Sequence, residues 1–121
     1  TSRWSRELVD GVAVTAARAR FVVARYRAAV AQLDGQPAAT VDAALAELDA
    51  ALADGAVVVA RRHADLHSHR PTPLVSRGLN RTLYQYGYLF NADTLCFWHR
   101  ERIELAVWLG RSTEPMPGCL F

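Results

Sequence analysis

Apolar residues recur at helical spacing through two long stretches of this chain, and turn residues separate the stretches. In residues 3–33 they return every three or four positions along one helix face, with arginines on its flanks. Gly35 and Pro37 follow in the order that helix ends prefer. A second stretch, residues 40–69, has Thr40 as its candidate N-cap and stops before Pro71 and Pro73. The sequence therefore predicts two long helices joined by a short turn.

The first helix is predicted to carry one apolar face. This face consists of Trp4, Leu8, Val12, Thr15, Ala19, Val22, Val23, Tyr26, Ala29, Val30 and Leu33.

Two shorter helices are predicted in the second half of the chain. Tyr84, Tyr86, Tyr88 and Phe90 alternate as in a strand, but a helical pattern accounts for the whole of residues 74–90. The apolar faces of residues 74–90 and 93–110 would point about 170° apart in one straight helix. We therefore expect a break at residues 91–94, with Asn91 or Asp93 as a cap, and an irregular tail over residues 111–121.

These elements predict a single all-α domain over residues 1–121, an up-down four-helix bundle with two long N-terminal helices and a shorter C-terminal helical hairpin. Charges support the first helix pair. Residues equally distant from the turn lie at the same height along the two antiparallel helices. This predicts the pairs Arg20–Asp54, Arg27–Glu47 and Arg25–Asp49.

The shorter hairpin is expected to cover the first helix pair near the N-terminus, because the long helices extend about 45 Å and the short ones about 27 Å. The turn end of the long pair would then expose an apolar surface. Its predicted interface residues are Val22, Val23, Tyr26, Val30, Leu33, Val41, Leu45 and Leu48. This surface favours a helical interaction or assembly module that forms a homodimer or joins a larger complex.

Histidines on the apolar helix faces indicate an alternative, a small helical-bundle enzyme. His63 and His67 lie four residues apart on the second helix, and Cys96 and His99 three apart on the fourth. Two such pairs offer a tetrahedral site for zinc or another transition metal. The competing interpretation is that His63 and His99 are core histidines bonded to tyrosine hydroxyls or carbonyl groups.

Arg102 also falls within the apolar arc of the fourth helix, where no acidic partner is evident. It is interpreted as the contact for a small anionic ligand, as a residue that reaches solvent along the bundle edge, or as part of an intersubunit pair. The candidate catalytic residues are thus Arg62, His67, His99 and Arg102.

Residues 62–67 resemble the Arg-x4-His signature of HEPN-type ribonucleases. The resemblance covers six residues and implies a four-helix bundle that joins its Arg and His pairs across a dimer to cleave RNA. On this chain it would make Arg62 the phosphate contact and His67 the acid/base group. Nucleic acid is expected as a partner only under this alternative.

Composition and charge narrow the classes of protein that fit this sequence. All 14 basic residues are arginine, as in high-GC bacterial genomes, and the net charge of +2 gives no argument for nucleic acid or membrane binding. No apolar run reaches the roughly 20 residues of a membrane span, and no signal peptide is evident. Two cysteines make no disulfide framework, so we expect a reduced, cytoplasmic protein.

Overall fold

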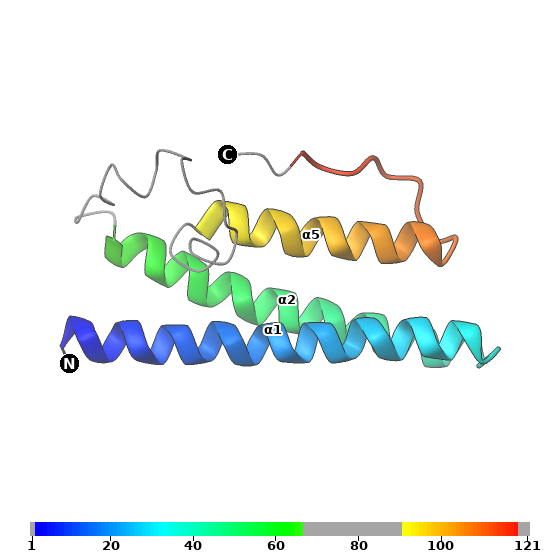
Figure 1. Ribbon diagram of the computed structural model, residues 1–121, viewed down its shortest axis with the longest axis horizontal. Helices are drawn as coiled ribbons and strands as arrows, with labels where there is room; N and C mark the ends of the chain where they lie inside the picture. The colour runs from blue at the N-terminus through cyan, green and yellow to red at the C-terminus, as the bar shows by residue number, and fades with distance from the viewer. Residues whose placement is uncertain (1, 67–90, 119–121) are drawn as a thin grey trace.

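A computed structural model describes residues 2–66 and 91–118 and contains three helices there: α1 (Arg3–Leu33), α2 (Ala38–Leu66) and α5 (Asn91–Trp108). The described part holds no strand, which confirms the all-α class. Figure 1 shows α1 and α2 as a long antiparallel pair with α5 beside them. The predicted helix at residues 74–90 lies outside the described residues. The four-helix layout therefore stays a prediction. The break predicted at residues 91–94 does not lie there, because α5 already begins at Asn91, which places both predicted caps, Asn91 and Asp93, inside the helix.

The helix ends follow local signals. Ser2 caps α1, since its hydroxyl accepts a bond from the amide of Ser5, 3.1 Å away. Gly35 takes the left-handed conformation (φ 66°) that closes α1, as Gly110 (φ 73°) does beyond α5. The helix α2 begins at Ala38, two residues before the predicted N-cap Thr40. The tail after α5 contains no helix or strand as far as residue 118, as expected.

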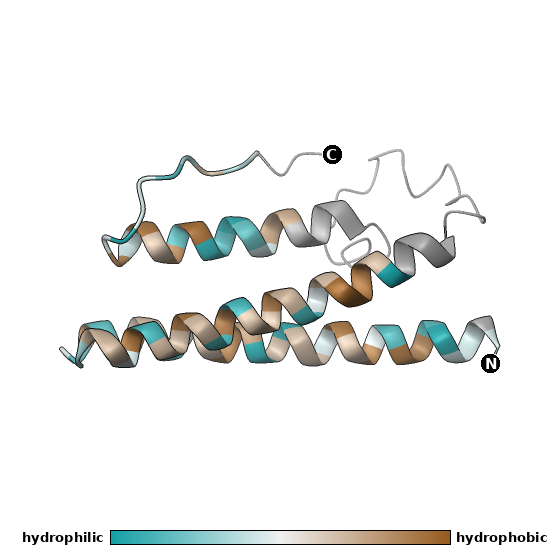
Figure 2. Ribbon diagram, turned by 180° about the vertical axis from the view of Figure 1, so that it is seen from behind, coloured by the Kyte–Doolittle hydropathy of each residue, from teal (hydrophilic) through white to brown (hydrophobic). Residues whose placement is uncertain are grey.

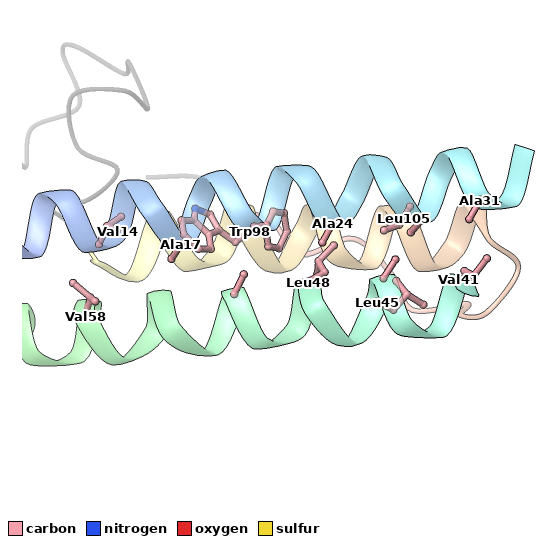
Figure 3. Packing of buried hydrophobic residues seen from close by; sticks show 14 residues of the cluster. Val14, Ala17, Ala24, Ala31, Val41, Leu45, Leu48, Val58, Trp98 and Leu105 are labelled. Carbon is pink, nitrogen blue, oxygen red and sulfur yellow. The ribbon is translucent and has the colours of Figure 1, made fainter. Parts of the chain in front are cut away.

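The contact between α1 and α2 is a seam of mostly small side chains (Figure 3). On α1 the buried positions are 10, 14, 17, 21, 24, 28 and 31, alternating three and four apart, which is the spacing of a coiled-coil seam. Most of them are alanines, which allow the helix backbones to approach closely. Phe21, Leu48 and Val41 are the largest fully buried side chains. The larger residues of the predicted apolar face lie mostly on the opposite side of α1, so the face that packs on α2 is the alanine-rich one and not the predicted one.

The helix α5 runs antiparallel to α2. Arg102 pairs with Asp49, and Arg111, just beyond α5, pairs with Asp42 near the start of α2. As residue numbers rise along α5 they fall along α2, so α5 ends beside the α1–α2 turn (Figure 1). The expectation that this helix covers the N-terminal end of the pair is therefore wrong.

Trp98 anchors α5 to the long pair. Its side chain is buried, and its ring lies 5.5 Å from that of Phe21 at an angle of 42°. The guanidinium of Arg18 lies over both rings, 5.1 Å from Phe21 and 5.5 Å from Trp98. Arg18 also donates to both carboxylate oxygens of Glu101, so one α1 residue binds both the ring and an acid of α5.

Gly55 leaves space for the ring of Trp98. Its substitution by alanine therefore has an effect on packing that can be compared with the gain in helix propensity. A Cβ at this position would lie 2.6 Å from Cζ3 of Trp98, whereas one at Gly11 would meet nothing within 4 Å. We expect Gly11→Ala to stabilise the fold by about 0.5–1 kcal/mol. Gly55→Ala should instead destabilise it, since displacing a packed ring costs about 1–3 kcal/mol. Thermal unfolding of both variants checks this. Equal stabilisation by both would contradict the Trp98 placement.

Ion pairs across the long helices confirm two of three predicted partners. Arg27 bonds Glu47 at 2.9 Å, and Arg20 bonds Asp54 at 2.7 Å. The Arg25–Asp49 pair is wrong, because α5 supplies competing charges. Arg25 lies 3.5 Å from Glu101, and Asp49 is taken by Arg102.

Asp10 is a buried carboxylate near the N-terminal end of α1, and Arg61 of α2 is its partner. Truncation of Asp10 should reduce the stability of the fold less than truncation of Arg61. Its side chain is 6% exposed, whereas Arg61, which donates to it, is 53% exposed. Arg61→Ala leaves a buried acceptor unpaired, so we expect it to lower the free energy of unfolding by about 1–3 kcal/mol. Asp10→Ala leaves an exposed, hydrated cation and should cost less than about 1 kcal/mol. Urea unfolding measures both; the reverse order would contradict this account.

Candidate functional site

An exposed apolar surface follows α1 from end to end, on the side away from α2. Eight large side chains form it, and we call it the α1 stripe: Trp4, Leu8, Val9, Val12, Val23, Tyr26, Val30 and Leu33. Trp4 and Leu33, at its two ends, are 83% and 73% exposed. Figure 2 shows apolar residues recurring along the part of α1 that α2 does not cover in this view. An apolar surface this long on a helix is typical of an interaction site.

The α1 stripe arises because α1 carries two apolar patterns. The seam positions and the stripe positions lie on roughly opposite sides of the helix at ~100° per residue. The α2 helix covers the alanine-rich pattern, and α5 packs beside the seam through Trp98 and Leu105. Among the described elements, none covers the second pattern.

Two hollows flank the stripe near the turn. The first, which we call the turn-end groove, lies between α1 and α2 and has a volume of about 650 Å³. It is lined by Val22, Val23, Tyr26, Arg27, Val30, Ala31, Asp34, Gln36, Thr40, Ala43, Ala44 and Glu47. The second is a cleft of about 360 Å³ between α1 and α5 that Leu33 and Trp108 help to line. Tyr26 borders both hollows, so it stands at the centre of the apolar surface here.

The predicted interface residues divide into two groups. Val23, Tyr26, Val30 and Leu33 are exposed on the stripe, and the half-buried Val22 lines the turn-end groove. Val41, Leu45 and Leu48 are buried between the helices, so their place in an interface is wrong. The reason is the alanine seam. Small residues on α1 let the larger residues of α2 pack fully into the helix pair.

Charge beside the stripe is compensated within the chain. The four arginines in the central and C-terminal parts of α1 each lie against a carboxylate of α2 or α5. The pairs are Arg18–Glu101, Arg20–Asp54, Arg25–Glu101 and Arg27–Glu47. A ligand at this part of the stripe would therefore meet apolar groups between neutralised pairs.

A third hollow, a more polar groove of about 780 Å³, lies between α2, α5 and the tail, and it brings together two predicted catalytic residues. His99 and Arg102 both line it, together with Arg111. His99 is exposed, so its prediction as a core histidine is wrong. Arg102 binds both oxygens of Asp49, at 2.7 and 3.2 Å, an acid that the sequence argument did not assign to it. Its charge is thus already compensated, which weakens the anion-site interpretation.

The predicted metal ligands are not brought together in the described part. Cys96 is disulfide-bonded, so its sulfur is not a free thiolate ligand, and the expectation of a reduced cysteine is wrong. Cys119, His67 and the side chain of His63 lie outside the described residues. Within the described residues no group of three or more His, Cys, Asp or Glu could hold a metal ion. The full zinc site stays a prediction.

The side chain of Arg62 also lies outside the described residues, as does His67. The ribonuclease alternative therefore stays a prediction as well.

In the part of the chain that the structure describes, no helix combines the length and apolarity that a bilayer crossing requires.

Comparisons with family models, with curated proteins and with solved structures found no match for this chain.

Proposed function

We propose that this protein is a helical interaction module that assembles with a protein partner through the α1 stripe. One observation carries the proposal: eight large apolar side chains lie exposed along one face of α1. Their exposed fractions run from 48% to 83%, so together they approach the ~800 Å² that one side of an interface of standard size buries. Burial of this surface in an interface would be favourable, because it removes large apolar side chains from water.

The nature of the partner follows from the chemistry of the stripe. Paired arginines along its margin give little attraction for a polyanion. Trp4 and Tyr26 belong to the residue types that most often dominate the binding energy of protein interfaces. An amphipathic helix of a protein partner, laid along α1, would contact the stripe over its length.

The polar groove with His99 offers less support for a catalytic function. Arg102 and Arg111 each bind an aspartate there, and His99 is exposed to solvent. None of these groups is held in the desolvated position that acid/base catalysis usually uses.

An apolar fluorescent dye tests the proposal when it is combined with the solution mass. We expect one of two results. Either the chain assembles and its dye binding falls as protein concentration rises, or it stays at 13.4 kDa and binds dye through the stripe. In the second case Val12→Glu with Val30→Glu should abolish dye binding, whereas Ala50→Glu with Ala53→Glu, on the exposed side of α2, should not. A monomer that binds no dye would contradict the proposal.

A further inference from the structure

We propose that the partner is a second copy of this chain, bound through the α1 stripe with the two α1 helices antiparallel about a two-fold axis near Ala19. The inference rests on the proposed function and names the occupant of the same surface. A two-fold axis applies every contact twice, so the stripe has to be complementary to itself.

The sizes of the stripe side chains match this arrangement. Large residues occupy both ends of the stripe, and the exposed small residues Thr15, Ala16 and Ala19 lie in its middle. An antiparallel copy centred near Ala19 sets Thr15 and Ala16 opposite the partner's Val22 and Val23. Small side chains then meet larger ones, and the helices can approach closely at the axis.

A parallel arrangement fits the same surface poorly. It would set every residue opposite its own counterpart, so Thr15, Ala16 and Ala19 would face small residues and leave a gap. The two Trp4 side chains would meet at one end. Antiparallel helices also place opposite dipole ends together, a small further contribution.

Trp4 and the cleft between α1 and α5 are the second complementary pair. In the antiparallel arrangement the start of one α1 lies beside the end of the other, and the two-fold axis keeps each residue on the same side of the contact. At ~100° per residue Trp4 lies on the side of Ala29 and Leu33, which help to line this cleft. Trp4 is 83% exposed, and the cleft of about 360 Å³ has room for its indole ring in each copy.

Area and charge also agree with a second copy. Eight large side chains, each 48% to 83% exposed, give an apolar area comparable with what each partner contributes to an interface of standard size. A copy brings the same compensated ion pairs to the central and C-terminal margins of the stripe, so two copies meet there without strong like-charge repulsion.

Cysteine cross-linking tests the geometry on the full chain. Residues near a two-fold axis approach their own counterparts, and a disulfide needs Cα atoms about 4.4–6.8 Å apart. We expect Ala19→Cys to form a covalent dimer under mild oxidation. Leu33→Cys and Ala53→Cys, the latter on the outer face of α2, should not link to themselves. Mass spectrometry of the linked peptides separates these bonds from those of the native cysteines.

A mixture of Trp4→Cys and Leu33→Cys chains should give a mixed dimer. Self-linking of Leu33→Cys without linking of Ala19→Cys would overturn the antiparallel arrangement.

Trp4→Ala supplies a measurement of affinity. Loss of a large aromatic anchor should weaken self-association by about tenfold or more, whereas Met116→Ala, in the exposed tail, should leave it unchanged. Equal effects of the two changes would count against the Trp4 contact. A monomer that binds apolar dye would overturn the second copy as partner and leave the proposed function standing. A monomer without dye binding would overturn both.

Discussion

Phe21→Ala should lower the free energy of unfolding by about 3–5 kcal/mol, the cost of truncating a fully buried aromatic side chain. Phe21 is 0% exposed and packs against Trp98 and the guanidinium of Arg18. Its removal therefore opens a cavity at the point where all three described helices meet. A domain of this size has a total stability of about 5–15 kcal/mol, so a large fraction is lost. The melting temperature should fall by roughly 10–20 °C.

Calorimetry and tryptophan fluorescence measure the effect. Val57→Ala, an exposed aliphatic truncation on α2, is the control and should change stability by less than about 0.5 kcal/mol. A loss below about 1 kcal/mol in Phe21→Ala would mean that Trp98 and Phe21 do not form the anchor of α5.

Val12→Glu combined with Val30→Glu should dissociate the assembly. The two valines are 64% and 51% exposed in the single chain, so glutamate is tolerated by the fold and has the higher helix propensity. In the assembly each glutamate would become a buried, unpaired charge, and the symmetry would apply it twice. We expect the dissociation constant to rise at least about 100-fold.

Two controls separate this effect from unfolding and from charge alone. Ala50→Glu with Ala53→Glu adds the same charge on the exposed side of α2 and should leave the mass unchanged. Leu45→Glu alters a buried core position, so it should unfold the chain instead of dividing the dimer. Dissociation by the Ala50/Ala53 control would show that net charge, and not the stripe, governs assembly.

The sequence predicts the described helices well because their signals are local. Apolar spacing and the turn at Gly35 define α1 over the predicted residues, and the start of α2 differs by two residues. The same periodicity does not say which face of α1 packs inward. A pattern of large residues and a pattern of alanines share that helix, and a ranking by hydrophobicity favours the large residues. Close packing against α2 favours the alanines.

The candidate site could be predicted only in part for the same reason. The exposure of Tyr26, Val30 and Leu33 follows from helix geometry and was expected. The burial of Leu45 depends on the small residues that α1 presents to it. The Arg102–Asp49 pair and the place of Trp98 on Gly55 depend on the position of α5, which no local pattern encodes.

Sedimentation equilibrium of the unmodified chain tests the central claim most directly. Concentrations from about 0.1 to 100 µM cover the dissociation constants expected of weak and firm dimers. The account predicts a mass that rises from 13.4 kDa to twice that value, or one that is already doubled at the lowest concentration. A constant mass of 13.4 kDa over the whole range would contradict self-association through the α1 stripe.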